Sequence, residues 1–246
     1  MNNTQLIGLS RQVSLSRELD IVANNVANIS TNGFKRRTSN FGEYLMPVAR
    51  ADTLPASQRK LSYVLDRDTP LDMSGGAIER TGNPMDVAIR GDALFAVQTP
   101  AGERYTRNGA LSLNARGDLV TSDGHPILSE QGPLAFTAAD GDIAIAADGT
   151  ISTAQGVRGK LRLVDAANPR NFGNAGKNLF VAQTTPAPAD KTARLESSAL
   201  ERSNVNSVGE ISRMIEITRS YTTLAQMIQK TDELRRSTLS RLVDNA

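Results

Sequence analysis

The sequence has no cysteine and no tryptophan, and its 246 residues include a single histidine. The absence of cysteine excludes structural disulfides and thiolate catalysis. Aromatic residues make up only 4% of the chain, and because aromatic side chains supply much of the buried area of a core, we expect a thin core. No apolar run approaches the roughly 20 residues that a membrane-spanning helix requires, so we expect no membrane insertion.

Motifs that carry catalytic or metal chemistry are also scarce. His125 lies in a turn before a strand, and the G-x-S-x-G elbow of many hydrolases is missing, so a hydrolase acting through His125 is a minor alternative. The segment Asp140-Gly141-Asp142 lacks the spaced oxygen ligands of a calcium loop, and Asn178 replaces the Ser or Thr that ends a phosphate loop. We therefore expect no enzyme, no cofactor and no metal site.

The charge balance is weakly basic, with a formal net charge of +2 and a pI near 9.0. The run Lys35-Arg36-Arg37 has no interleaved aromatics, so it is more typical of a solvated or interface charge run than of a phosphate-binding patch. We therefore expect no nucleic-acid partner. The N-terminus also lacks the pattern of a secretory signal, so export would need another route.

Helical periodicity extends from about Thr4 to Ile29 and ends in Ser-Thr-Asn-Gly, where Asn or Gly can adopt the left-handed conformation that ends a helix. One face of this helix carries Leu15, Leu19, Val22, Val26 and Ile29. The opposite face carries Leu6, Leu9 and Val13, so one partner cannot cover both. Asn24, Asn25 and Asn28 either face solvent or fix the register between packed helices.

A second helical period extends from about Val208 to Val243. It also has two stripes. The first consists of Val208, Ile211, Ile215, Thr218, Thr222 and Ala225. The second consists of Met214, Ile217, Tyr221, Leu224 and Ile228. Two stripes again indicate two packing surfaces.

Between Pro84 and about Val181, short alternating runs are separated by X-Gly turns, which predicts an all-β domain, a sandwich or a partly open barrel. We therefore expect a mixed fold in which the terminal helices form an antiparallel stalk with a central all-β domain at its far end. The expected parts are an N-terminal helix (1–33), an extended connector with short strands (34–82), the β-domain (83–184), a return linker (185–204) and a C-terminal helix (205–246).

Apolar stripes left in water are unfavourable by about 25 cal/mol per Å². Neighbouring subunits would cover them, so the sequence predicts a polymer subunit whose ends become ordered on assembly. A binding module for glycan or peptidoglycan, with helices that only oligomerise it, remains an alternative.

Three blocks of sequence resemble the axial proteins of the bacterial flagellum, the rod and hook subunits. They are ANNVANISTNGFK (23–35), TGNPMDVAIRGD with VQTPAGERYTRNG (81–92 and 97–109), and ERSNVN (201–206) followed by Met214, Ile215, Arg219 and Tyr221. The length is short for a hook subunit. The sequence of these blocks is most similar to that of proximal-rod members of the family, and distal-rod members are the alternative.

This resemblance implies a structural role in the periplasmic rod of the flagellar basal body, which transmits torque from motor to hook. It further implies delivery by the flagellar type III export apparatus and contacts with copies of the chain and with adjacent proximal- and distal-rod proteins. The residues we expect at subunit contacts are Leu19, Val22, Asn24, Asn25, Val26, Asn28, Ile29, Gly33, Asn204, Asn206, Ile211, Met214, Ile215, Tyr221 and Leu224.

Overall fold

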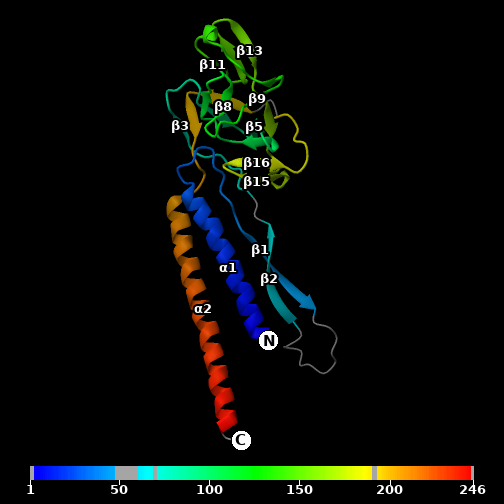
Figure 1. Cartoon of the computed structure of the whole chain (residues 1–246), viewed down its shortest axis with the longest axis vertical. Coiled ribbons are helices and arrows are strands. Elements are labelled where there is room, and N and C mark those ends of the chain that lie inside the picture. Colours follow the sequence, from blue (N-terminus) through cyan, green and yellow to red (C-terminus); the bar gives the residue numbers. More distant parts are fainter. Residues whose placement is uncertain (1–2, 48–59, 69–70, 190–192, 245–246) are drawn as a thin grey trace. The chain divides into compact units, whose positions relative to one another are not determined.

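The computed structural model describes residues 3–47, 60–68, 71–189 and 193–244 (Figure 1). The chain forms two compact units. The helical unit comprises residues 1–26, 38–69 and 207–246, and the β-rich unit comprises residues 27–37 and 70–206. Each unit therefore combines segments that are far apart in the sequence.

The helical unit contains α1 (Asn3–Ala27) and α2 (Ser207–Asp244), which lie side by side (Figure 1). They run antiparallel, because Asn25 near the end of α1 contacts Glu210 in the first turn of α2, whereas Gly8 faces Ile228 much further along α2. Neither of these described helices is apolar enough over a sufficient length to cross a lipid bilayer. The predicted pair of terminal helices is thus confirmed.

The segment expected as an extended connector contains three strands. Two of them, β1 (Asn40–Pro47) and β2 (Lys60–Asp68), pair antiparallel in the helical unit. The third, β3 (Ile78–Arg80), belongs to the β-rich unit. Residues 48–59 and 69–70 of this segment lie outside the described residues.

The β-rich unit consists of several small antiparallel sheets, and the predicted central β region is confirmed. Its largest sheet has five strands in the order β14-β5-β6-β16-β15, and a three-stranded sheet has the order β11-β12-β13. The strands after β3 are β4 (Val87–Arg90), β5 (Ala93–Thr99), β6 (Gly102–Thr106), β7 (Leu111–Leu113), β8 (Leu119–Thr121), β9 (Leu128–Ser129), β10 (Gly132–Pro133), β11 (Ala144–Ile145), β12 (Thr150–Thr153), β13 (Gly156–Lys160), β14 (Leu163–Asp165), β15 (Phe172–Gly176), β16 (Leu179–Ala182), β17 (Arg194–Ser197) and β18 (Ala199–Glu201).

Strand β5 divides the core of the β-rich unit in two. Because side chains alternate along a strand, Phe95 and Val97 enter one buried cluster, whereas Leu94 and Ala96 enter another. In the second cluster the rings of Tyr105 and Phe172 meet edge to face, with centroids 5.7 Å apart. Two small cores built mainly from aliphatic residues therefore compensate for the low aromatic content.

The predicted X-Gly turns have two different physical origins. Gly117, Gly124, Gly141 and Gly149 have positive φ angles between 65° and 88°, as the turn chemistry predicts. Gly109 does not belong to this group. A Cβ there would lie 1.7 Å from the carbonyl oxygen of Val87, so this glycine is required for close approach of two backbone segments.

The three-stranded sheet provides a test of this core. Ile151 in β12 is completely buried, so we expect Ile151→Ala to lower the free energy of unfolding by about 2–5 kcal/mol, because it leaves a cavity. Urea unfolding of the full chain, followed by hydrogen exchange of β12 amides, measures the loss. The matched control is Val157→Ala in neighbouring β13, where the side chain is 70% exposed and we expect a change within about 0.5 kcal/mol. Equal losses for both variants would contradict the assignment of this core.

Candidate functional site

The seam between α1 and α2 is formed by one stripe of each helix. Leu15, Val22 and Ile217 are buried at its centre. Partly buried residues that complete it are Leu19, Val26, Met214, Tyr221 and Leu224. Six residues expected at subunit contacts thus pack inside this chain: Leu19, Val22, Val26, Met214, Tyr221 and Leu224.

Polar contacts fix the register of this seam. The Asn25 amide donates to the Glu210 carboxylate at 3.2 Å, and both side chains are buried. The Gln12 amide donates to the Tyr221 hydroxyl, also at 3.2 Å. A shift of one helix along the other would leave the buried Glu210 carboxylate without this donor, which is costly in an apolar environment.

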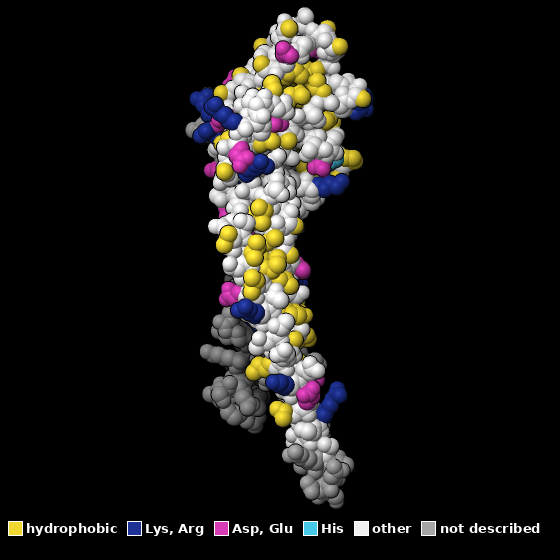
Figure 2. Space-filling view, turned by 90° about the vertical axis from the view of Figure 1, so that its left-hand side faces the viewer, with side chains coloured by type: hydrophobic (Ala, Val, Ile, Leu, Met, Phe, Trp, Pro, Cys, Tyr) yellow, Lys and Arg dark blue, Asp and Glu magenta, His cyan; other side chains and the backbone are white. Residues whose placement is uncertain are grey.

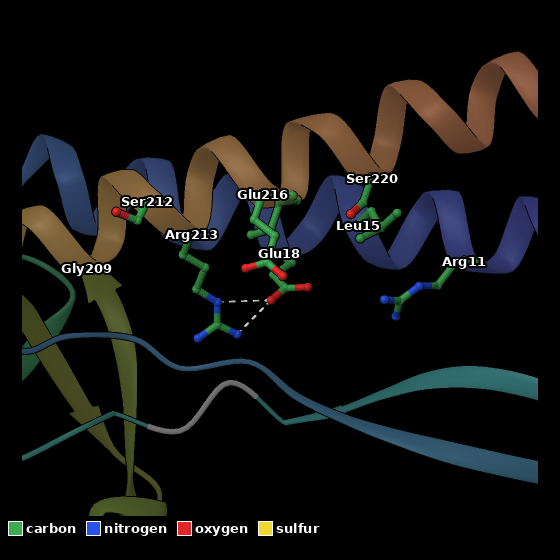
Figure 3. Close-up of a pocket in the computed structure, with 9 residues that line it drawn as sticks. Arg11, Leu15, Glu18, Gly209, Ser212, Arg213, Glu216 and Ser220 are labelled. Carbon is green, nitrogen blue, oxygen red and sulfur yellow. Dashed lines mark hydrogen bonds and ion pairs between the residues drawn. The ribbon is translucent and has the colours of Figure 1, made fainter.

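An open groove of about 540 Å³ follows one side of the seam. Figure 3 shows Arg213 of α2 pointing toward Glu18 of α1, with two Arg213 nitrogens 2.6 and 3.1 Å from the same carboxylate oxygen. Arg11 lies at the other end of this groove, beyond Leu15 (Figure 3). The Arg213–Glu18 ion pair is partly exposed, so it adds little to the free energy of unfolding. Its main effect is on how the two helices are aligned.

The stripe of each helix that does not take part in the seam remains in solvent. On α2, Val208 is 74% exposed, and Ile211 and Ile215 are 46% and 49% exposed. On α1, Leu9 and Val13 are 51% and 48% exposed. Figure 2 shows hydrophobic side chains gathered along the helical unit. The predicted two-sided character of both helices is therefore present in the structure.

The other residues expected at subunit contacts lie near the helix ends. Asn24 is half-buried in α1, and Asn28 and Ile29 are half-buried in the turn that follows it. The Asn28 side-chain oxygen accepts a bond from the Thr31 hydroxyl at 3.1 Å. Asn206 is exposed directly before α2.

A buried ion cluster lies in the β-rich unit. The Lys35 ammonium is 2.6 Å from one oxygen of Glu201, and the Arg107 guanidinium is 2.5 Å from the other. The exposed fractions of the three side chains are 1% for Lys35, 1% for Glu201 and 5% for Arg107. We call these three residues the ion cluster.

Backbone groups make further hydrogen bonds with the ion cluster. Lys35 also donates to the carbonyl oxygen of Ser74 at 2.7 Å, and the Gly76 N–H donates to Glu201 at 2.9 Å. Arg107 donates to the carbonyl oxygens of Ile89, Gly91 and Ala93. These hydrogen bonds make burial of the charges tolerable.

The ion cluster joins the sequence blocks at the two ends of the chain. Gly33 has a φ of 66°, and its N–H donates to the Glu201 carbonyl oxygen at 2.7 Å. A Cβ at Gly33 would lie 2.5 Å from the Arg107 carbonyl carbon. Asn204 accepts from the Arg36 N–H at 2.7 Å and donates to the Asp72 carbonyl oxygen at 2.8 Å. Gly33 and Asn204 therefore make contacts within the chain.

Sequence reasoning missed the ion cluster. Reading Lys35-Arg36-Arg37 as a solvated or interface charge run is wrong for Lys35, which is 2% exposed. The reason is that its partner Glu201 is 166 residues away in the sequence, and no local pattern reveals such a pairing. The one signal that the sequence offered for this cluster was the location of its members. Lys35, Arg107 and Glu201 each lie in one of the blocks quoted above.

The charges in the ion cluster shift one another's pKa values. Burial alone would raise the pKa of Glu201, but Arg107, Lys35 and the hydrogen bonds outweigh it and hold this pKa below the ordinary 4.5. Burial lowers the pKa of Lys35 from its ordinary 10.5, although Glu201 opposes the shift. The carboxylate is thus the anion that compensates two buried cations.

Among the described residues, no three potential metal ligands gather in one place. His125 follows β8 in a turn, where its backbone N–H donates to the Thr121 hydroxyl at 3.3 Å.

Removal of the Glu201 charge tests the ion cluster. We expect Glu201→Gln to lower the free energy of unfolding by about 3–5 kcal/mol, because it leaves two buried cations without their anion. Urea unfolding with hydrogen exchange of β4 and β5 amides measures this loss. The control is Glu79→Gln, because Glu79 and its partner Arg202 have side chains 56% and 45% exposed, so we expect a loss of about 1 kcal/mol or less. A similar effect of both substitutions would refute the role of the ion cluster.

Acid should weaken the β-rich unit. The pKa of Glu201 is lower in the folded state, so its stabilising contribution is complete above the unfolded pKa and is lost as the pH falls through the folded value. The pKa of Asp140 is lowered in the same direction, to about 2, chiefly by the Thr137 N–H and also by Arg158. We expect the free energy of unfolding to fall between about pH 5 and about pH 2.

Urea titrations at several pH values measure this slope. The slope should be shallower in Glu201→Gln and unchanged in Glu79→Gln. A stability that is constant over this pH range would contradict the charged state assigned to Glu201.

Comparisons with known proteins match the chain in three places. Residues 6–35 match a family described as "Flagella basal body rod protein". Residues 88–153 match "Flagellar hook protein FlgE/F/G D1 domain", and residues 196–242 match "Flagellar basal body rod FlgEFG protein C-terminal". The first and last matches contain Lys35 and Glu201, and the middle match contains Arg107.

Whole-chain relatives agree with these matches. A flagellar basal-body rod protein FlgF of Caulobacter vibrioides is 38% identical, over 98% of each chain. The FlgF of Escherichia coli is 36% identical over 87% of each chain. The FlgG rod protein of Bacillus subtilis is 30% identical, over 92% of this chain and 94% of its own. Because three family matches and these relatives point the same way, the chain belongs to the FlgF family of flagellar basal-body rod proteins, which are structural, non-enzymatic components of the rod.

Proposed function

We propose that this rod subunit polymerises through its terminal helices and thereby transmits torque from motor to hook. The observation that carries this proposal is the exposed stripe of α2, where Val208, Ile211 and Ile215 remain in solvent although the opposite stripe is buried in the seam. Proteins rarely leave a continuous apolar stripe uncovered without a partner. In the assembled rod, the neighbouring subunits are that partner.

The two exposed stripes lie on different helices, which decides the kind of contact. Packing the α2 stripe of one subunit against the α1 stripe of the next, at Leu9 and Val13, joins two different surfaces. Such a heterologous contact does not close into a dimer and generates rings or open helical filaments. It therefore suits a shaft.

The seam within one chain is thin. Among the described hydrophobic side chains, only Leu15, Val22 and Ile217 are buried in it. Fully burying an aliphatic side chain contributes about 1.5–3 kcal/mol, so three such residues offset little of the conformational entropy of two long helices. We infer that contacts with neighbours complete the order of the helices on assembly.

Three roles are assigned under this proposal to residues expected at subunit contacts. Ile211 and Ile215 lie on the exposed stripe and contact neighbours directly. The seam residues and Asn25 set the register with which one chain presents its stripes. Asn24, Asn28, Ile29 and Asn206 lie at or near the helix ends, where we propose contacts with the subunits above and below. Those subunits are copies of this chain and adjacent proximal- and distal-rod proteins, and the flagellar type III apparatus delivers each chain to the periplasm.

A charge on the exposed stripe tests polymerisation. We expect Ile215→Asp to abolish swimming and to remove the chain from isolated basal bodies, because it places an unpaired charge in an apolar interface. The free energy of unfolding of the purified chain should change by no more than about 0.5 kcal/mol, because the side chain is half exposed in the isolated subunit.

The matched control is Ser220→Asp, an exposed position on another side of α2. We expect this variant to swim and to assemble normally. Wild-type swimming of Ile215→Asp would refute polymerisation through this stripe.

A further inference from the structure

The described part of the β-rich unit exposes two large hydrophobic side chains. Leu113 at the end of β7 is 41% exposed, and Val157 in β13 is 70% exposed. A single exposed aliphatic residue is ordinary on a protein surface. These two differ because Leu113 lies in the wall of a pocket, whereas Val157 projects from an edge strand.

The pocket has a volume of about 580 Å³ and lies beside β11. Met85, Leu113, Ile143 and Ile145 give it an apolar lining. Part of this lining is well packed, because Ile143 and Ile145 belong to the buried core of the unit. Asp142, which is exposed, is the acidic residue of the lining.

Val157 lies across the same sheet from this pocket. It pairs with Ser152 of β12, which in turn pairs with Ala144 of β11. Directly paired residues share one face of a sheet, so Ala144, Ser152 and Val157 lie on the outer face, while the adjacent Ile145 and Ile151 are buried. The pocket therefore borders one edge of the three-stranded sheet, and Val157 stands on the strand at the other edge.

The charges near these two features have opposite signs. Lys160 lies in β13, three residues from Val157, with 46% of its side chain exposed and a distant contact of 4.0 Å to Glu130. Arg158 lies between them and is already paired with Asp140. Lys160 is therefore the cation near Val157 that can reach an outside partner, and Asp142 is its counterpart at the pocket.

We propose that Val157 of one copy inserts into the Met85–Leu113 pocket of a second copy of this chain, with Lys160 facing Asp142. The unit carries both the projecting side chain and a pocket able to receive it. Because the two lie at different places on the surface of the unit, the contact is heterologous and repeats from copy to copy. This proposal rests on the proposed function only in requiring that copies stand next to each other in the rod. It assigns a subunit contact to the β-rich unit in addition to the helices.

One small contact of this kind is weak alone. Its effect is multiplied in an assembly, because helices that already join two copies raise the effective concentration of the pocket for its neighbour. The contact would then resist rotation of one β-rich unit against the next, which a torque-bearing shaft requires.

The absence of cysteine makes a direct test possible. Cells co-express two forms of the chain, Val157→Cys and Met85→Cys, and their basal bodies are isolated and oxidised. A disulfide forms only if the two Cα atoms come within about 7 Å. We expect a covalent dimer on a non-reducing gel, several-fold above each single variant and above a Glu130→Cys with Met85→Cys control. Leu113→Cys in place of Met85→Cys gives an independent pair should Met85→Cys fail to assemble.

A second pair separates the two proposals. Val13→Cys with Ile215→Cys reports on the helix stripes. Cross-linking of this helix pair without cross-linking at Val157 to either pocket residue overturns the pocket contact and leaves polymerisation through the helices intact. The reverse result overturns the stripe-to-stripe contact alone, and failure of all pairs in assembled basal bodies overturns both.

The charge complementarity is tested in the same cross-linking assay. Asp142→Lys in the Met85→Cys form should reduce the Val157–Met85 dimer several-fold, and adding Lys160→Asp in the Val157→Cys form should restore it. A dimer yield that Asp142→Lys leaves unchanged overturns the assigned orientation.

Discussion

The buried carboxylate of Glu201, held between Lys35 and Arg107, is the interaction on which the β-rich unit depends. Its two partners, Lys35 and Arg107, lie 166 and 94 residues away from Glu201 in the chain. A buried charge without its partner is strongly unfavourable, so the unit is complete only when both end segments of the chain are in place. This explains why residues 27–37 belong to the same compact unit as the strands.

The helices divide their apolar surface between two tasks. The stripe that contains Leu15, Val22 and Ile217 holds one chain together, and the stripe that contains Val208, Ile211 and Ile215 stays available. Such a division is unfavourable for an isolated monomer, because the exposed stripe leaves apolar surface in contact with water and adds nothing to the stability of the chain. It is appropriate for a rod component, whose final environment is other rod proteins.

The two units also differ in how they are stabilised. The β-rich unit has two mainly aliphatic cores on the two faces of β5 and a buried ion cluster, all formed by contacts within one chain. The helical unit has a thin seam, fixed by Asn25 with Glu210 and by Arg213 with Glu18. A well-packed β-rich unit and a helical unit with an uncovered apolar stripe are features expected of a subunit that assembles with other rod proteins.

Local sequence patterns determined the two terminal helices, the central strands and most of the glycine turns, because helical period, strand alternation and positive φ are properties of neighbouring residues. They also showed that each helix has two apolar stripes. Only the tertiary structure decided which stripe is buried, that Gly109 is needed for close approach to Val87, and that Lys35 is an interior cation rather than part of a surface charge run. The physical reason is that these outcomes depend on partners far away in the sequence, and a side chain's burial and charge pairing are set by what the fold brings next to it.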